Sequence, residues 1–184
     1  MSNLLDATTL DGFRMSALQR SITKEKSICK ANFRKNASTW RSSMICCMEE
    51  QDLDEVALLE QQVFSKPWSR KSFADSVAKP ENLYLVAKEE GELLGYCGLW
   101  GVGDEGQITH VCVKQSARGK GVGKQLLLEM LAKGRERGLQ AFTLEVRVSN
   151  TPARELYKKV GFTEAGIRKG FYDAPKEDAM IMWL

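Results

Sequence analysis

Features of several protein classes are missing from this chain of 184 residues. No apolar run approaches eighteen residues, so the sequence contains no candidate membrane span. A single histidine, His110, and an odd number of cysteines without metal-ligand spacing leave little material for a metal site. We therefore expect no zinc or iron, and one cytosolic domain of ordinary size. The cysteines, which we predict to be reduced thiols that mostly pack, are Cys29, Cys46, Cys47, Cys97 and Cys112.

Charge is unevenly distributed along the chain, whose formal net charge is +3. Residues 1–43 carry eight basic and three acidic side chains, a balance of +5, so residues 44–184 carry −2. This leader lacks the apolar segment and cleavage site of a secretory signal. Three interpretations stay open: a disordered basic tail, an organelle-type transit segment, which Asp6 and Asp11 disfavour, or an extension from a misassigned start upstream of Met44. We expect the leader to be mostly disordered and the domain to span residues 44–184.

A short glycine-rich segment, residues 118–123, is the most informative part of the chain. It follows an apolar run at 108–113 and precedes a good helix former at 124–131. Glycines let the backbone approach an anion, and the unpaired N–H groups at a helix start attract negative charge. Lys120 and Lys124 add positive charge. The order of strand, turn and helix start therefore predicts a phosphate-binding site.

Two common phosphate-binding motifs do not fit this segment. The G-x-x-x-x-G-K-[S/T] loop would need a glycine in place of Arg118 and a hydroxyl in place of Gln125. The G-x-G-x-x-G dinucleotide motif, started at Gly119, meets Lys124 where its third glycine belongs. The remaining pattern, R-x-x-G-x-G, resembles the pyrophosphate loop of the acetyl-CoA-dependent GNAT superfamily of N-acetyltransferases. An ordinary glycine-rich turn before a helix is the alternative.

Residues 144–162 strengthen this resemblance. They combine a strand, a helix with Asn150 at its cap and Tyr157 within it, and then Gly161-Phe162, as in the second half of the GNAT core. Several stretches are similar to the bacterial RimI group, whose members acetylate the N-terminal alanine of small-subunit ribosomal protein 18. The resemblance covers the chain after the leader. The stretches are Phe64–Phe73, Leu144–Arg147, Ser149-Asn150, Leu156-Tyr157, Gly161-Phe162, Ile167–Tyr172 and Glu177–Met182.

The resemblance implies an α/β (α+β) domain of the GNAT acyl-CoA N-acyltransferase fold, with a mixed, mostly antiparallel sheet flanked by helices. Hydrophobic periodicity, cap residues and turn residues predict the same order of elements. The cap and turn signals are Asp52 with Glu55, Ser69, Glu90-Gly91, Pro152 and Gly161. The expected strands are 44–48, 83–88, 93–100, 107–114, 141–146, 162–168 and 178–183, and helices are expected from Asp52 to before Pro67, from Ser69 to about 77, after the glycine turn to about 137, and at 151–159.

By resemblance, the cofactor is acetyl-CoA, held mainly by main chain. In GNAT proteins the strand before the loop splays from the next one, and its unpaired backbone groups bind the pantetheine arm. The resemblance assigns this role to Val111, Cys112 and Val113, and Asn150 is placed to reach the same arm or simply to cap its helix. Gly121 and Gly123 are expected to be critical, because a Cβ there would push the anion away. The pyrophosphate would be wrapped by Arg118, Gly119, Lys120, Gly121, Val122, Gly123 and Lys124.

Acyl transfer from a thioester to an amine needs a proton acceptor for the amine and a proton donor for the departing thiolate. The resemblance assigns these roles to Glu145, acting directly or through water, and to Tyr157. The alternatives are a solvent-facing or Arg147-paired carboxylate and an amphipathic core tyrosine. His110 should share a strand face with Ile108 and Cys112, so we expect it to pack and hydrogen-bond. Acceptor-groove residues implied by the resemblance are Trp68, Arg168, Lys169, Phe171 and Tyr172.

We therefore predict a protein N-alpha-acetyltransferase that modifies a protein N-terminus, with the ribosomal alanine type as first choice. The acidic surplus of residues 44–184 favours a basic peptide. The alternatives are acetylation of a small amine or a lysine side chain, and a CoA-binding regulatory module without turnover. We expect a cytoplasmic monomer or weak dimer with no direct nucleic acid binding, no membrane association and no metal.

Overall fold

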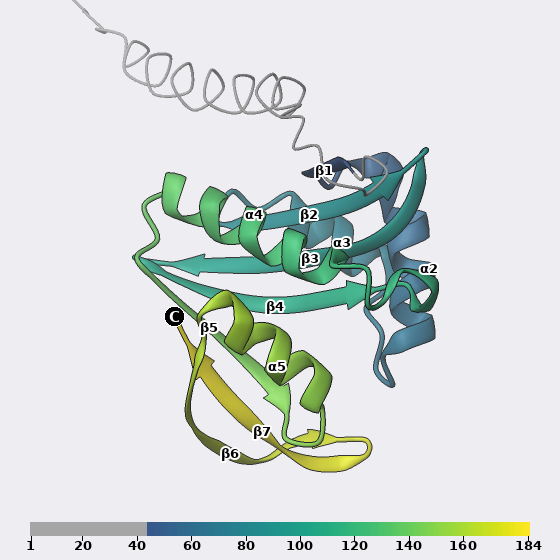
Figure 1. Cartoon of the computed structure of the whole chain (residues 1–184). Helices are drawn as coiled ribbons and strands as arrows, with labels where there is room; N and C mark the ends of the chain where they lie inside the picture. The colour runs from purple at the N-terminus through teal and green to yellow at the C-terminus, as the bar shows by residue number, and fades with distance from the viewer. Residues whose placement is uncertain (1–43) are drawn as a thin grey trace, which may run out of the picture. The chain divides into compact units, whose positions relative to one another are not determined.

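A seven-stranded sheet forms the centre of the computed structural model, which describes residues 44–184 (Figure 1). The expectations for residues 1–43 lie outside the described residues. The strand order across the sheet is β1-β2-β3-β4-β5-β7-β6. In chain order the elements are β1 (Met44–Cys47), the short 3-10 turn η1 (Glu50–Asp52), α2 (Leu53–Val63), α3 (Arg70–Val77), β2 (Asn82–Glu89), β3 (Glu92–Val102), β4 (Glu105–Val113), the 3-10 turn η2 (Gln115–Ala117), α4 (Val122–Glu136), β5 (Ala141–Arg147), α5 (Thr151–Val160), β6 (Thr163–Asp173) and β7 (Lys176–Trp183).

The sheet is mixed and mostly antiparallel, as the sequence predicted. Every neighbouring pair of strands is antiparallel except β4 and β5, which run parallel over Glu105–Ile108 and Ala141–Leu144. Helices α4 and α5 cover one face of the sheet, and α2 and α3 cover the other (Figure 1). Each face therefore has its own apolar core, one built around α4 and α5 and one around α2 and α3. None of the helices in residues 44–184 is long and apolar enough to cross a membrane.

Local signals fixed several element ends where we predicted them. Ser69 caps α3 by accepting a hydrogen bond from the Ser72 backbone N–H at 3.1 Å. The β2–β3 hairpin turns at Glu90 and Gly91, with φ of 52° and 86°, which is the left-handed pair that a two-residue turn requires. Helix α5 has a proline in its first turn and ends at Gly161, where φ is 113°.

Asp52 stands at the N-cap position of α2, as predicted, but the capping hydrogen bond expected of its side chain was wrong. The Asp52 side chain makes no cap hydrogen bond to α2. It accepts instead from the Glu49 backbone N–H at 2.9 Å, and its carboxylate pairs with Lys88 of β2. Asp52 is only 3% exposed, so it is a buried partner of Lys88. Its hydrogen bond from the Glu49 N–H caps the η1 turn, which precedes α2. The sequence signal located the helix start but misassigned the side chain's partner.

Candidate active site

Strands β4 and β5 separate halfway along their length. Their parallel ladder ends at the pair Ile108 and Leu144. Beyond that point β4 pairs with β3 and β5 pairs with β7. The separation coincides with a bulge in β4, where Gly98 pairs with His110 and Leu99 with Ile108, leaving Thr109 as an extra residue. An extra residue bends its strand and increases its twist, so the bulge accounts for the gap.

The predicted pantetheine strand, residues 111–113, lies in this separated part of β4. The main chain there has no β5 partner, so its groups on that side face the gap. The side chains of Val111 and Val113 pack against the α4 core, and Cys112 packs against the α2 core. Side-chain packing and a main-chain contact in the gap are therefore compatible at these positions.

The glycine turn after β4 contains two residues in the left-handed backbone region. Gly119 and Gly121 have φ of 74° and 83°, a region that residues with a Cβ rarely adopt. Gly121 is the N-cap of α4, and no side chain caps this helix start. The first amides of α4 therefore lack a side-chain acceptor, next to the exposed side chains of Lys120 and Lys124. Arg118 donates its Nε–H to the Val113 carbonyl at 3.1 Å and ties the turn to the end of β4.

Gly123 has a packing constraint besides the phosphate contact that we expect of it, which stays a prediction. It lies inside the first turn of α4 and is buried. A Cβ at this position would come within 3.1 Å of Leu156 Cδ2 on α5. Its small size therefore sets the approach of α4 to α5. The pair that the backbone conformation requires is Gly119 and Gly121.

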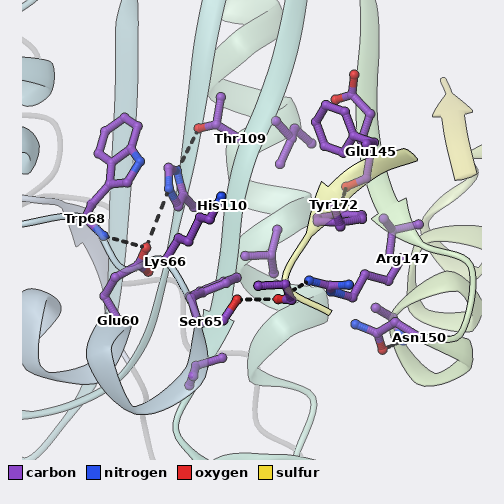
Figure 2. A pocket seen from close by; sticks show the side chains of 18 of the residues that line it. Glu60, Ser65, Lys66, Trp68, Thr109, His110, Glu145, Arg147, Asn150 and Tyr172 are labelled. Atoms are coloured by element: carbon purple, nitrogen blue, oxygen red, sulfur yellow. Dashed lines mark hydrogen bonds and ion pairs between the residues drawn. The ribbon is translucent and has the colours of Figure 1, made fainter. Parts of the chain in front are cut away.

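The gap between β4 and β5 opens into a pocket of about 690 Å³ (Figure 2). One wall comes from the end of α2 and the loop that follows it, and the opposite wall comes from β5 and the β6–β7 hairpin. Both predicted catalytic residues line it, and so does Asn150. The lining residues are Glu60, Val63, Phe64, Ser65, Lys66, Trp68, Gln107, Ile108, Thr109, His110, Val111, Glu145, Val146, Arg147, Asn150, Ala153, Tyr157, Phe171, Tyr172, Asp173, Ala174 and Pro175.

Glu145 is the first residue of β5 beyond the parallel ladder. Its carboxylate accepts a hydrogen bond from Gln107 Nε2 at 3.0 Å and lies 3.3 Å from Arg168 Nη1. The alternative of an Arg147 pair was wrong, because Arg147 pairs with Glu177 at 3.1 Å. The Glu145 side chain is 14% exposed, so it lies at the pocket wall and is sheltered from bulk water.

Tyr157 lies on α5 and is 8% exposed. Its ring packs edge-on against Phe162 with centroids 6.0 Å apart. Burial raises the pKa of Tyr157 above its ordinary value, and nearby Tyr172 and Cys97 act in the same direction. The phenol therefore keeps its proton through the neutral pH range, which a proton donor requires.

Asn150 has the helix-capping role that was the simpler of its two interpretations. Its Oδ1 accepts a hydrogen bond from the Ala153 backbone N–H at 3.2 Å. This contact occupies the side-chain oxygen, and the residue also lines the pocket. Its contact with the pantetheine arm stays a prediction.

His110 occupies the opposite wall, in a buried polar cluster that the sequence did not reveal (Figure 2). Its ring lies 4.5 Å from the Trp68 ring, and its Nδ1 is 3.0 Å from Thr109 Oγ1. Its Nε2 is 3.9 Å from the carboxylate of Glu60, which is 1% exposed and also contacts the Tyr96 hydroxyl. Burial lowers the pKa of His110 to about 4 and raises the pKa of Glu60. Both groups therefore favour their neutral forms.

The strand face predicted for His110 was half right. His110 faces the α2 core with Cys112, whereas Ile108 belongs to the α4 core. The extra residue at Thr109 reverses the alternation of side chains between Ile108 and His110. Glu60 was missed altogether, although one signal was present. It lies four residues after Val56, where the apolar stripe of α2 calls for a hydrophobic side chain.

Two loops meet across the pocket mouth. Ser65 donates its hydroxyl to the Ala174 carbonyl at 2.7 Å (Figure 2). Lys66 pairs with Asp173 at 2.7 Å. These contacts join the loop after α2 to the β6–β7 hairpin. Three of the predicted groove residues line the pocket: Trp68, which follows the loop after α2, and Phe171 and Tyr172 of β6. Arg168 stacks on Phe171, and Lys169 is exposed on β6.

Within residues 44–184, no group of three or more His, Cys, Asp or Glu side chains is arranged to hold a metal ion. The four cysteines of this region, Cys46, Cys47, Cys97 and Cys112, form no disulfide.

Comparison with known proteins agrees with this architecture. The family model described as Acetyltransferase (GNAT) family matches residues 53–162. A Bacillus subtilis protein provisionally named a ribosomal protein bS18-alanine N-acetyltransferase is 41% identical over 138 residues, which is 74% of this chain and 91% of that protein. The Haemophilus influenzae ribosomal protein bS18-alanine N-acetyltransferase is 34% identical over 144 residues, covering 76% of this chain and 97% of that protein.

A solved structure has the same fold. The crystal structure of the ribosomal-protein-S18-alanine N-acetyltransferase from Escherichia coli superimposes with a TM-score of 0.71 at 32% identity. The match covers 78% of this chain and 93% of that chain. It includes the mixed sheet flanked by helices that the sequence predicted. The chain belongs to the GNAT family of acetyltransferases.

Proposed function

We propose that this protein transfers the acetyl group of acetyl-CoA to the N-terminal α-amine of a protein, and that its acceptor is the N-terminal alanine of small-subunit ribosomal protein S18. The observation that carries the reaction is the presence of Glu145 and Tyr157 in one pocket, at the gap between β4 and β5. The acceptor rests on the names of relatives that are 34% and 41% identical over most of their length.

The residues present fit acetyl-CoA. A Cβ built on Gly119 or Gly121 meets no heavy atom within 4 Å, so there is open space beside both glycines. The uncapped start of α4 would supply N–H donors, with Lys120 and Lys124 nearby. The separated main chain at residues 111–113 would bind the pantetheine arm as an added strand would. Together these groups would direct the acetyl end toward the pocket.

Within the pocket Glu145 and Tyr157 divide the two proton transfers. Glu145 accepts the proton that the amine loses, directly or through one water, and the amine nitrogen bonds to the acetyl carbon. The carbon–sulfur bond then breaks, and Tyr157 donates its phenolic proton to the departing sulfur. The raised pKa of Tyr157 keeps that proton in place until a thiolate forms. The tyrosine then recovers a proton from solvent.

The acceptor is a protein chain end, and the charge of residues 44–184 suits a basic one. The proposal requires the cytoplasm, where acetyl-CoA and ribosomal proteins meet. It requires neither nucleic acid binding nor a metal. A monomer is sufficient, because both catalytic residues come from one chain.

A CoA-release assay tests the proposal. The full chain is incubated with acetyl-CoA and an alanine-led basic peptide, with spermidine, or with free lysine. Turnover of the peptide alone is expected. Turnover of spermidine or lysine alone would indicate a small-amine or side-chain acetyltransferase. Binding of acetyl-CoA without turnover of any acceptor would indicate a regulatory module, and Glu145→Gln with an unchanged rate would remove Glu145 from the reaction.

A further inference from the structure

The carboxylate of Glu145 has two contacts of different character. Gln107 donates from Nε2 to Oε2 at 3.0 Å, and both side chains are partly buried. Arg168 lies 3.3 Å from the other oxygen, Oε1, but its side chain is 59% exposed. An exposed ion pair contributes little and is screened by salt. The orientation of Glu145 therefore depends more on Gln107 than on Arg168.

The sheet itself places Gln107 beside Glu145. Gln107 pairs with Thr143 in the parallel ladder, and Glu145 is two residues further along β5 on the same face. Residues 142, 144 and 146 belong to the α4 core, so Glu145 points to the opposite face. Gln107 is the last side chain on that face before the bulge at Thr109. The contact therefore spans the point where the two strands separate, and it is fixed by strand register.

We propose that Gln107 is a positioning residue that holds Glu145 in the orientation from which it accepts the amine proton. This inference rests on the proposed function. The amide N–H of Gln107 donates to one carboxyl oxygen and fixes the rotation of the group, and the amide itself carries no charge. Glutamine does not titrate, so the contact persists across the assay range. The other oxygen, Oε1, faces an exposed cation that an incoming ammonium can replace.

The first test is Gln107→Leu, which removes the donor and keeps a side chain of similar size. We expect kcat with the alanine-led peptide to fall about tenfold, because a misplaced base loses part of its contribution. The KM for acetyl-CoA should stay within twofold, since Gln107 lies on the acceptor side. Gln61→Leu, at an exposed position on α2, is the matched control and should keep the wild-type kcat. A normal kcat in Gln107→Leu overturns the inference.

The second test asks whether Gln107 acts through Glu145. In the Glu145→Gln background, Gln107→Leu should cost less than twofold, because the group that it positions is gone. An undiminished tenfold loss in that background would mean that Gln107 acts independently. If Glu145→Gln alone leaves the rate unchanged, the proposed function fails instead. The two failures are therefore distinguishable.

The third test uses Gln107→Glu, which keeps the size and shape of the side chain. Two carboxyl groups at this distance share a proton at low pH, so one of them stays protonated until the pH rises. The acid limb of the kcat/KM profile should move upward by at least one pH unit. This shift would show that the side chain at position 107 contacts the group whose ionisation controls the acid limb. An acid limb that superimposes on the wild-type profile overturns the inference even if Gln107→Leu does not fold.

Discussion

Lowering the pH from 7 to 5 should destabilise the fold through His110, the only histidine of the chain. The ring is 9% exposed and is enclosed by aromatic side chains, with Trp68 at 4.5 Å and Phe73 at 5.9 Å. Burial lowers the pKa of His110 to about 4. In the unfolded chain the ring titrates near its ordinary value of 6.5. Below pH 6.5 the unfolded chain therefore binds a proton that the folded chain does not, and folding stability is lost as the pH falls.

The size of this effect follows from the two pKa values. The displacement from 6.5 to about 4 corresponds to about 3 kcal/mol once the pH is below both values. By pH 5 roughly 2 kcal/mol of that loss is already present. The titratable groups that face the ring are Glu60 from α2, Tyr84 from β2 and Tyr96 from β3. Burial raises the pKa of Glu60, so protonation of this carboxyl on acidification increases the folding stability. This gain partly offsets the loss caused by His110.

Two measurements separate His110 from the other groups. Urea unfolding at pH 7 and pH 5 is compared between the wild type and His110→Phe, which keeps an aromatic ring in the same packing. The wild type should lose about 2 kcal/mol more than the variant between these pH values. The single histidine also gives one ring resonance, which should not titrate between pH 7 and pH 5 in the folded protein. A ring that titrates near pH 6.5, or equal losses in both proteins, would refute the reasoning.

Three further predictions concern single side chains. Tyr157→Phe should lower turnover about 100-fold while calorimetry still shows acetyl-CoA binding, and an unchanged rate would remove Tyr157 from the reaction. Gly103 and Gly121 both have positive φ and open space around them, so alanine at either should cost about 1 kcal/mol of stability. Only Gly121→Ala should weaken acetyl-CoA binding, and equal affinities would exclude Gly121 from the cofactor site. Ser69→Ala removes the cap hydrogen bond from the Ser72 N–H and should lower the free energy of unfolding by about 1 kcal/mol, measured by thermal unfolding. An unchanged unfolding curve would show that the cap does not stabilise the fold.

Features set by neighbouring residues were predictable from the sequence. The hairpin at Glu90-Gly91 needs two residues that accept positive φ, and the cap of α3 needs a hydroxyl at Ser69. Both requirements are met within four residues of chain. The glycine turn belongs to the same class, because its motif and its conformation lie in one short segment. Family resemblance then supplied the mixed, mostly antiparallel sheet flanked by helices, which no local pattern contains.

Features set by distant partners were not predictable in the same way. The carboxylate of Asp52 looked like a helix cap, but its partner is Lys88, 36 residues away. Glu60 was missed, and its buried contacts are with Tyr96 and His110 of two strands. The close approach of Leu156 to Gly123 was also not predictable, and the phosphate contact of Gly123 stays a prediction. Each of these contacts depends on which helices and strands pack together. The local sequence pattern does not specify which elements become neighbours.

The bulge at Thr109 determines both the gap between β4 and β5 and the unexpected orientation of His110. One extra residue in β4 ends the ladder with β5, so the main chain at 111–113 loses its neighbour and becomes available to a ligand. The same extra residue reverses the alternation of side chains along β4, so His110 points toward Trp68 and the other aromatic rings. Gln107, before the bulge, hydrogen-bonds Glu145. Strict alternation along β4 would have kept His110 on the Ile108 face, against the α4 core. Under the proposed function, this irregular register would let one sheet bind acetyl-CoA through the backbone of β4 and orient Glu145 through the side chain of Gln107.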